Sequence, residues 1–220
     1  VRLLILKNAK IFHEGLIKKG NILIDGKVIS SILIGDSKEE FDTLRQKNSD
    51  NKEIDCEGKY ILPGIIDIHV HLRDLGQSEK ETFRTGTKAA ASSGITTVLN
   101  MPNTVPPSIT KESIMAWKKK AENDIFCNVG FIAGVPSNLT RENIEEILNL
   151  GVFGFKIYPL HSLNGIDWTN KTNLSRLLTF SSEFQFPIFI HPDWPMTSDE
   201  RRRQYLDALE NGQSVLQAHN

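Results

Sequence analysis

The sequence predicts an α/β fold in which parallel strands alternate with helices, preceded by a small N-terminal β unit. From residue 61 onward, short apolar runs typical of strands are separated by longer stretches typical of helices. Strands that alternate with helices indicate a parallel sheet. Residues 1–34 differ, because only turn residues separate their apolar runs. We therefore expect two domains, residues 1–60 as a small β subdomain and residues 61–220 as a βα domain.

The first domain contains three apolar runs, RLLILKNAKIF, GNILID and VISSILI. Asp25 and Gly26 stand between the second and the third. An Asp-Gly pair between apolar strands is a strong β-hairpin signal. The segment 36–52 is polar and charged, and we expect it to form an inserted loop with one helical turn.

The second domain contains five pairs of a strand and a helix. Thr110 and Thr140 are candidate helix N-caps, and Gly94 and Gly151 stand where helices should end. A closed (β/α)8 barrel needs eight such pairs and about 250 residues, so either the sheet is open or the chain stops short of closure. The expected strands are 64–72, 95–101, 126–133, 153–158 and 187–192, and the expected helices are 79–93, 110–122, 140–150, 172–184 and 198–210.

The composition argues against several kinds of partner. Lys and Arg total 26 and Asp and Glu total 27, which leaves a net charge of -1, so nothing favours nucleic acid or an anionic membrane surface. No apolar run approaches the ~20 residues of a membrane span, and the first residues lack a signal-peptide cleavage site. Cys56 and Cys127 form no disulfide framework. We expect a cytoplasmic protein with reduced thiols and a small-molecule substrate.

The stretch IIDIHVHLR, residues 65–73, carries the first chemical signal. Its apolar residues predict a buried strand, in which alternate side chains share a face, so His69, His71 and Arg73 would lie on one side. At about 3.3 Å per residue, the histidine Cα atoms would be ~6.6 Å apart, close enough for both imidazoles to bind one metal ion. The alternative is a pair of hydrogen-bonded core histidines, which this stretch alone does not exclude.

Three more candidates stand near the ends of later strands: Asn103, Lys156 and His191. In parallel α/β proteins the active site lies at the carboxyl ends of the strands, so these residues should meet the two histidines. Arg73 suits a substrate carboxylate, bound by paired charge-assisted hydrogen bonds, and the Asn103 amide would add a neutral donor. This pattern predicts an acidic substrate.

Lys156 stands between Phe155 and Ile157 in an expected buried strand, where an unpaired ammonium group is too costly to bury. One remedy is an ion pair with a carboxylate. The remedy we favour, because three histidines converge on the same edge, is carbamylation by carbon dioxide, which gives an anionic group able to bridge two cations. Two cations about 3.5 to 4 Å apart would polarise a carbonyl and supply a nucleophile near neutral pH. Hydrolysis of an amide or cyclic imide is the chemistry that this arrangement favours.

The motifs GIIDIHVHLRD, ETFRTGTKAAASSGITTVLNMPNTVPP and GFKIYP together resemble the dihydroorotases, in the cyclic amidohydrolase branch of the amidohydrolase superfamily. The resemblance covers residues 54–193, and IDCEGKYILPG resembles the passage from that family's small β-sandwich into its barrel. It implies a (β/α)8 TIM-type barrel with only its first five βα units present, behind the N-terminal part of a β-sandwich in residues 1–60.

The resemblance also implies roles for individual residues. Arg73 and Asn103 would hold the carboxylate of dihydroorotate or N-carbamoyl-L-aspartate, whose reversible ring closure is a step of de novo pyrimidine biosynthesis. Carbamylated Lys156 would bridge two Zn²⁺ ions. The histidine ligands would be His69 and His71 on the more buried ion and His191 on the other.

Of the departures from the family, two bear most on the site. Leu75 stands where relatives usually have proline after the Arg-Asp pair, a loop change that we expect to be tolerated. The family also has another zinc-binding histidine on the sixth strand and, on the eighth, an aspartate that acts as general base. This sequence ends at Asn220, before those strands, so the catalytic base is not assigned. His219 is a poor substitute, because it stands at the end of a helix or in a loop.

Two alternatives stay open. An allantoinase or hydantoinase would use the same metals on an uncharged ring, and Arg73 and Asn103 argue against it. A catalytically inactive dihydroorotase-like subunit would instead bind or stabilise a partner, for example the carbamoyltransferase of the previous pathway step. Such a subunit has no physical need for Lys156 in a buried strand. Whether active or not, the chain has two expected protein partners, a second copy in a homodimer or a pathway enzyme.

Overall fold

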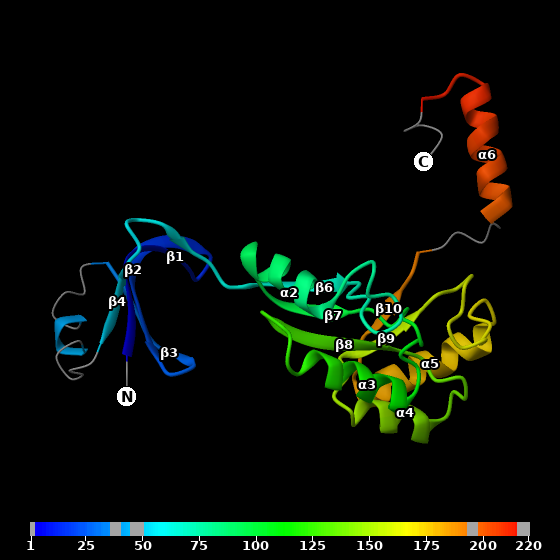
Figure 1. Cartoon of the computed structure of the whole chain (residues 1–220), viewed down its shortest axis with the longest axis horizontal. Helices are drawn as coiled ribbons and strands as arrows, with labels where there is room; N and C mark the ends of the chain where they lie inside the picture. Colours follow the sequence, from blue (N-terminus) through cyan, green and yellow to red (C-terminus); the bar gives the residue numbers. More distant parts are fainter. Residues whose placement is uncertain (1–2, 36–40, 45–50, 193–197, 215–220) are drawn as a thin grey trace. The chain divides into compact units, whose positions relative to one another are not determined.

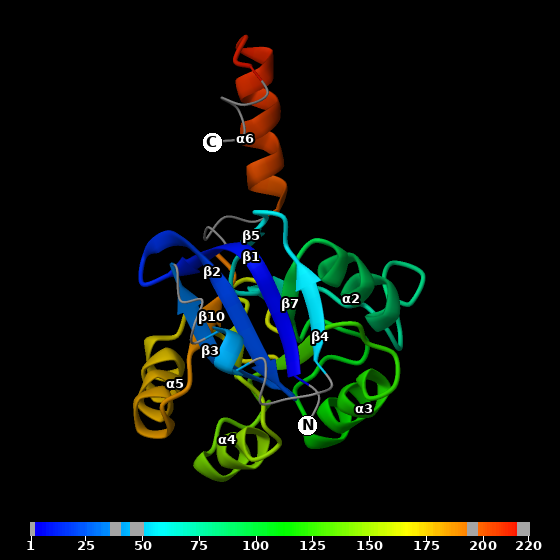
Figure 2. The ribbon, with the colours of Figure 1, turned by 90° about the vertical axis from the view of Figure 1, so that its left-hand side faces the viewer.

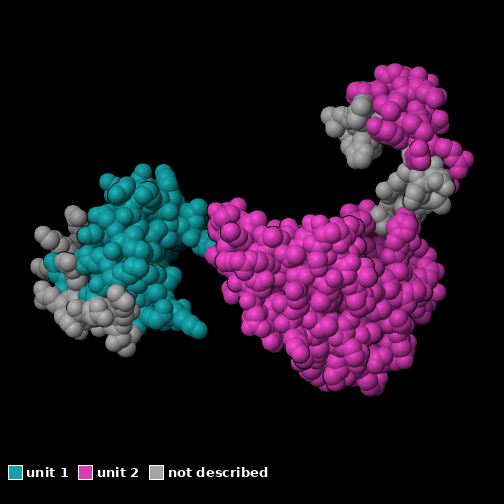
Figure 3. All heavy atoms as spheres, viewed as in Figure 1, with its two compact units in different colours: residues 1–64 teal, residues 65–220 magenta. Residues whose placement is uncertain are grey.

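The structure is a computed structural model that describes residues 3–35, 41–44, 51–192 and 198–214. The chain divides into two compact units, residues 1–64 and residues 65–220 (Figure 3). Each unit has its own sheet and its own clusters of buried apolar side chains. None of the described helices is long and apolar enough to cross a membrane.

A mixed sheet of five strands forms the first unit (Figure 1). Its first three strands pair in antiparallel fashion, and two short strands pair with β1 in parallel. The expected hairpin at Asp25 and Gly26 is confirmed, and Gly26 adopts the left-handed φ of +59° that glycine allows in such turns. The strands are β1 (Leu3–His13), β2 (Leu16–Asp25), β3 (Val28–Ile34), β4 (Lys52–Asp55) and β5 (Tyr60–Ile61).

Within the polar segment 36–52, residues 41–44 form the one helical turn that we expected. Phe41 and Leu44 of this turn pack against a buried cluster that contains Ile5 and Leu23. Residues 36–40 and 45–50 lie outside the described part of the chain. Lys52, which we expected at the end of the loop, instead begins β4. The sequence of β4 does not predict a strand, and this short strand forms because it pairs with β1.

Five parallel strands form the sheet of the second unit, in the order β6-β7-β8-β9-β10. A helix connects each strand to the next, and α2, α3, α4 and α5 lie in an arc outside the strands (Figure 2). Neighbours in sequence are therefore neighbours in the sheet, as in the first part of a (β/α)8 barrel. This confirms the predicted α/β class. The elements are β6 (Ile65–Val70), α2 (Phe83–Ser92), β7 (Ile95–Asn100), α3 (Lys111–Ala121), β8 (Asn128–Gly134), α4 (Arg141–Leu148), β9 (Gly154–Ile157), α5 (Lys171–Phe184), β10 (Ile188–Ile190) and α6 (Ser198–Glu210).

The expected helix boundaries are confirmed at two starts and two ends. Thr110 caps α3 and Thr140 caps α4, each by accepting a hydrogen bond from a backbone N–H in the first turn at 3.3 Å. Gly94 and Gly151 follow α2 and α4 with φ of +83° and +77°, the left-handed conformation that ends a helix. These local signals were readable because caps depend on residues close in sequence.

The expected strand 64–72 is shorter and less buried than its composition suggested. β6 ends at Val70, and Ile65, Ile66 and Ile68 are 57%, 61% and 53% exposed. The expectation of a buried strand was therefore wrong for this stretch. β6 is an edge strand of the described sheet, and α2 packs against its neighbour β7. Apolar composition alone does not distinguish such an edge from a covered strand.

Candidate active site

The six candidate residues lie at or beyond the carboxyl ends of four strands. Lys156 is the third residue of the four-residue strand β9, and His191 directly follows β10. Because the strands are parallel and adjacent, their carboxyl ends lie along one edge of the sheet. The other candidates are His69 in β6, His71 and Arg73 just beyond it, and Asn103 in the loop after β7.

His69 and His71 are neighbours, with ring centres 5.3 Å apart and ring planes at 55°. They do not, however, share one face of a strand with Arg73, because the chain leaves β6 at Val70. The backbone N–H of Leu72 donates to the side-chain oxygen of the buried Asn100 at 2.8 Å, and not to a backbone carbonyl of a neighbouring strand. The sequence therefore predicted the pairing of the two histidines. It did not reveal that the Asn100 side chain holds the loop after β6, in which His71 lies.

The environment of both imidazoles favours their uncharged form. Burial lowers the pKa of His69 and of His71, and the charge of Lys156 acts in the same direction on both. Arg73 lowers the pKa of His71 further. Neutral imidazole is the form that binds metal ions. Lys156 thus acts electrostatically on both rings.

Lys156 is 4% exposed, and all four residues of β9 are buried, so the expected burial of this lysine is confirmed. Its strand neighbours are Gly134 on β8 and Phe189 on β10. The Lys156 Nζ atom lies 5.5 Å from the centre of the Tyr158 ring. The amine is thus enclosed by the sheet and by an aromatic side chain.

Tyr158 was not a candidate from the sequence, yet it lies among the candidate residues. Its ring centre is 5.5 Å from that of His191, whose backbone N–H donates to Ile157 at 3.0 Å. Burial raises the pKa of Tyr158 to about 12, although the charge of Arg73 lowers it in part. The available signal was its spacing of two residues from Lys156, which puts both on one face of an extended chain.

Arg73 is held by two neighbours. Its Nη1 atom donates to the backbone carbonyl of Asn103 at 2.7 Å and, at 3.5 Å, to the Gln77 side chain. A guanidinium group has five N–H donors, so these bonds orient it and leave donors for a ligand. Asn103 therefore contributes its backbone carbonyl, a role that sequence reasoning missed.

Asp74 organises the loop that follows Arg73. This 5% exposed carboxylate accepts hydrogen bonds from Leu75 N and the Ser78 hydroxyl through Oδ1, and from Phe83 N, the first residue of α2, through Oδ2. We expected the following helix to begin at residue 79, but α2 begins at Phe83. The reason is that residues 75–80 form turns around Asp74. The same carboxylate fixes the chain on the C-terminal side of Arg73.

The residues present fit part of a metal site. The Nδ1 atom of His71 and the Oδ1 atom of Asn103 are buried without a well-formed hydrogen bond among the described residues, although the Asn103 side chain is near enough to His71 to raise the pKa of its imidazole in part. Within the described part of the chain, no group of three or more His, Cys, Asp or Glu side chains is close enough to hold a metal ion. Two imidazoles beside a lysine could therefore supply some ligands of a metal centre, but the described residues hold no complete set.

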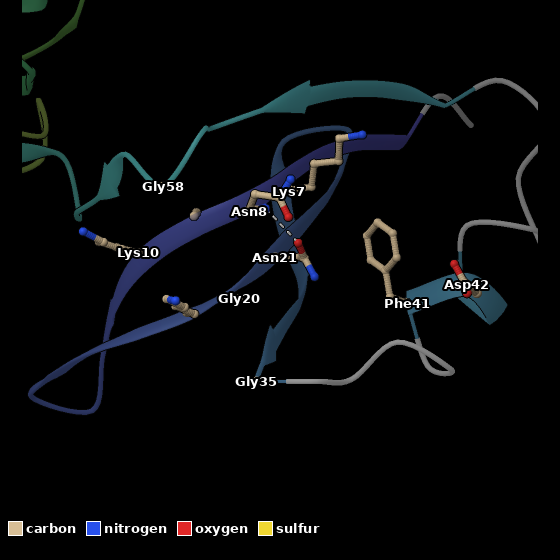
Figure 4. Close-up of a pocket in the computed structure, with 11 residues that line it drawn as sticks. Lys7, Asn8, Lys10, Gly20, Asn21, Gly35, Phe41, Asp42 and Gly58 are labelled. Atoms are coloured by element: carbon tan, nitrogen blue, oxygen red, sulfur yellow. Dashed lines mark hydrogen bonds between the residues drawn. The ribbon is translucent and has the colours of Figure 1, made fainter.

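A separate pocket of about 560 Å³ lies on the sheet of the first unit (Figure 4). Its lining includes Lys19 and the aromatic ring of Phe41, and the backbone N–H of Asn8 donates to Asn21 there at 3.0 Å. None of the candidate residues lines this pocket.

Comparison with known sequences identifies the relatives of this chain. Residues 58–155 match the family model described as dihydro-orotase-like. An allantoinase from Arabidopsis thaliana is 37% identical over 202 residues, which are 90% of this chain and 38% of that protein. A dihydroorotase from Methanosphaera stadtmanae is 33% identical over 190 residues, which are 86% of this chain and 39% of that protein. The chain thus spans about two fifths of the length of these curated relatives.

Comparison with solved structures identifies the fold. The L-hydantoinase (dihydropyrimidinase) from Arthrobacter aurescens matches 98% of this chain with a TM-score of 0.73 at 22% identity, over 46% of its own length. The D-hydantoinase (dihydropyrimidinase) from Thermus sp. matches 95% with a TM-score of 0.70 at 26% identity, over 43% of its length. The five βα units thus match part of the barrel of these structures.

The fold and the sequence matches together define a class of protein. The chain is a homologue of the cyclic amidohydrolases and belongs to this family of dihydroorotases, allantoinases and hydantoinases. Within the family, its most similar sequences divide between allantoinases and dihydroorotases.

Proposed function

We propose that this chain is part of a dihydroorotase, an enzyme that reversibly cyclises N-carbamoyl-L-aspartate to dihydroorotate in de novo pyrimidine biosynthesis. The observation that carries the proposal is the placement of Arg73, oriented by Asn103 and Gln77 and near the histidine pair. A fixed guanidinium group beside a hydrolytic site suits a substrate that carries a carboxylate. Dihydroorotate carries one, whereas hydantoin and allantoin do not.

The proposed roles of the residues follow from their positions. Arg73 and Asn103 would bind the substrate carboxylate and so place the ring amide near His69 and His71. The ligands of two Zn²⁺ ions would be His69, His71, His191 and Lys156, the last as a carbamate. When bound, such ions would polarise the amide carbonyl and acidify a water molecule.

Lys156 has a further requirement before it could serve as a ligand. An ammonium group is a cation and cannot bind a metal ion, whereas a carbamate is an anion with two oxygen atoms. Lys156 is 4% exposed, and the neutral form of an amine is the one that attacks carbon dioxide. Hydrolysis also requires that the leaving nitrogen receive a proton. We assign no donor of this proton among the described residues.

The domain assignment is part of the same proposal. Residues 1–60 would form the N-terminal part of a small β-sandwich, and residues 61–220 the N-terminal portion of a (β/α)8 barrel. We also propose a cytoplasmic location and a small-molecule substrate as the principal partner.

Allantoinase is the second candidate, because the 37% identical relative from Arabidopsis thaliana is an allantoinase. This identity extends over 90% of the chain, and a dihydroorotase is similar over 86% of it. Because relatives of both kinds match nearly the whole chain, sequence similarity alone does not decide the substrate. An inactive subunit that binds a second copy or a pathway enzyme remains the third candidate.

The test compares three substrates on the zinc-loaded complete natural polypeptide, namely dihydroorotate, allantoin and hydantoin. The proposal predicts that dihydroorotate has the highest kcat/KM. A higher kcat/KM for allantoin or hydantoin would move the protein to another branch of the family. No turnover of any of the three, in protein that binds zinc, would favour the inactive subunit.

A further inference from the structure

Two hydrogen bonds join the loop after β6 to the loop after β7. Besides the bond from Arg73 Nη1 to the Asn103 carbonyl at 2.7 Å, the backbone N–H of Gly76 donates to the backbone carbonyl of Val105 at 3.1 Å. One of these bonds fixes a side chain of the candidate site, and the other joins backbone to backbone. The two loops are therefore attached to each other at two points.

The contact between Gly76 and Val105 leaves no room for a side chain at residue 76. A Cβ atom on Gly76 would lie 2.6 Å from Cβ and 2.8 Å from Cγ1 of Val105, and it would also overlap the Val105 carbonyl oxygen. Carbon atoms that are not bonded to each other pack at about 3.5 to 4.0 Å. Gly76 is not among the residues with a positive φ, so glycine is required here by the close approach of the two backbones and not by its conformation.

The residue before Gly76 shows that the loop is held in this shape. Leu75 has a φ of +70°, a left-handed conformation that is unfavourable for a residue with a side chain. Leu75 is 40% exposed, so packing of its side chain does not explain the conformation. Unfavourable backbone conformations persist where surrounding contacts impose them. Here the Leu75 N–H donates to the Asp74 carboxylate at 3.0 Å, and the next residue is fixed by its bond to Val105.

The separation of the two loops determines how Arg73 is held, because each loop carries one acceptor of its guanidinium group. Gln77, which directly follows Gly76, accepts from Arg73 Nη1 at 3.5 Å. Asn103, on the other loop two positions before Val105, accepts from the same atom at 2.7 Å. A methyl group at residue 76 would push the loops apart, and the two acceptors would move apart with them.

We propose that Gly76 is a positioning residue for the substrate carboxylate, because it sets the separation of the two loops that orient Arg73. The inference rests on the proposed dihydroorotase function and adds a residue to its specificity. Gly76 itself would touch no substrate atom. A guanidinium group that is oriented before the ligand binds loses less free energy on binding, and this advantage applies only to a substrate that carries a carboxylate.

The experiment compares the complete natural polypeptide with its Gly76→Ala variant, both loaded with zinc. The probes are dihydroorotate, dihydrouracil as the same ring without the carboxylate, and orotate as a carboxylate ligand for binding measurements. The KM for dihydroorotate and the Kd for orotate should rise about 10- to 100-fold, the change expected when a hydrogen bond to a charged group is lost. The KM for dihydrouracil should change less than about 3-fold, and kcat for dihydroorotate should fall less than its KM rises.

Gly20→Ala is the matched control for a general loss of stability. Gly20 lies in the first unit, has no positive φ, and its added Cβ would also overlap a backbone carbonyl oxygen, that of Leu33. Both variants should lower the thermal midpoint, but only Gly76→Ala should lower the ratio of kcat/KM for dihydroorotate to that for dihydrouracil. An equal fall of this ratio in Gly20→Ala would assign the effect to stability and overturn the inference.

A second pair of variants covers the case in which Gly76→Ala does not fold. The double variant Gly76→Ala/Val105→Gly removes two of the three atoms that the added methyl group meets, and only the Val105 carbonyl oxygen remains in its way. This variant is compared with Val105→Gly alone, which has the same altered loop without the methyl group. Orotate should bind the double variant about 3-fold or more weakly than it binds Val105→Gly. Equal Kd values would overturn the inference.

The outcomes also separate the inference from the proposed function. If the wild-type protein shows no preference for dihydroorotate over dihydrouracil and does not bind orotate, both fail. If the wild-type protein prefers dihydroorotate and Gly76→Ala keeps the same preference and the same Kd for orotate, only the inference fails.

Discussion

Arg73 donates a 2.7 Å hydrogen bond from Nη1 to the backbone carbonyl of Asn103, which joins the loop after β6 to the loop after β7. Arg73 and Asn103 are 30 positions apart in the chain, and they meet because their strands are adjacent and parallel. The contact orients the guanidinium group before a ligand binds, and preorganised groups lose less free energy on binding. The substrate specificity that we propose depends on this contact.

Replacing Arg73 with lysine tests the role of the guanidinium group. Lysine keeps the charge but cannot make paired hydrogen bonds to a carboxylate, so the KM for dihydroorotate should rise about 10- to 100-fold. Steady-state kinetics would measure the change. Arg84→Lys is the matched control, because Arg84 forms an exposed ion pair with Asp124, and its KM should equal that of the wild type. An unchanged KM in Arg73→Lys would remove the basis for an acidic substrate.

Lys156→Ala tests the proposed carbamate. Native mass spectrometry of the wild-type protein should show a mass increase equal to one carbon dioxide molecule, and the variant should lack it. Because ligand loss weakens metal binding, the zinc content of the variant should also fall by about half or more. Lys119→Ala, on the exposed side of α3, should retain both the added mass and the zinc. A wild-type protein that binds zinc without the added mass would contradict the carbamate.

Asp74→Asn tests the loop that supports Arg73. An amide has one acceptor oxygen in place of two, so bonds from Leu75, Ser78 or Phe83 are lost, and the free energy of unfolding should fall by about 1 to 3 kcal/mol. The KM for dihydroorotate should rise more than kcat falls, because Arg73 is less well oriented. Urea denaturation measures the first effect, and steady-state kinetics the second.

The matched control for this prediction is Asp124→Asn. Asp124 lies in an exposed ion pair with Arg84, so its replacement should cost less than about 1 kcal/mol. If both variants lose the same stability, Asp74 has no special role in the loop.

Cys127 gives a prediction about pH. Burial raises the pKa of this thiol above its ordinary value, so at any given pH a smaller fraction is thiolate than in an unperturbed cysteine. In a Cys56→Ser background, the reaction of Cys127 with a disulfide reagent should be slower than that of a free thiol at pH 8 and should reach half its maximal rate at a higher pH. A rate profile centred at or below that of free cysteine would contradict the burial of Cys127.

Much of the fold was predictable because its signals are local. The Asp25-Gly26 turn, the caps at Thr110 and Thr140, and the alternation of strands with helices each depend on residues within a few positions. The rule that active sites lie at the carboxyl ends of parallel strands then predicted where His191 and Lys156 would lie.

Other features depend on contacts between distant residues, and sequence reasoning missed them. The exposure of Ile66 and Ile68 reflects the position of β6 at the sheet edge. The Asn100 side chain accepts a hydrogen bond from Leu72, 28 positions away, just beyond the end of β6. Tyr158 becomes notable only because its hydroxyl lacks a partner among the described residues. Neither role has a pattern that composition or periodicity reveals.

The most direct test of the proposed function is the ratio of kcat/KM for dihydroorotate to that for dihydrouracil, measured on the zinc-loaded complete natural polypeptide. The two rings differ in the carboxylate that Arg73 is proposed to bind. If Arg73 holds the carboxylate by paired charge-assisted hydrogen bonds, the ratio of the two kcat/KM values should be about 100 or more. A ratio near one would show that Arg73 does not select the substrate, and the assignment as a dihydroorotase would be wrong.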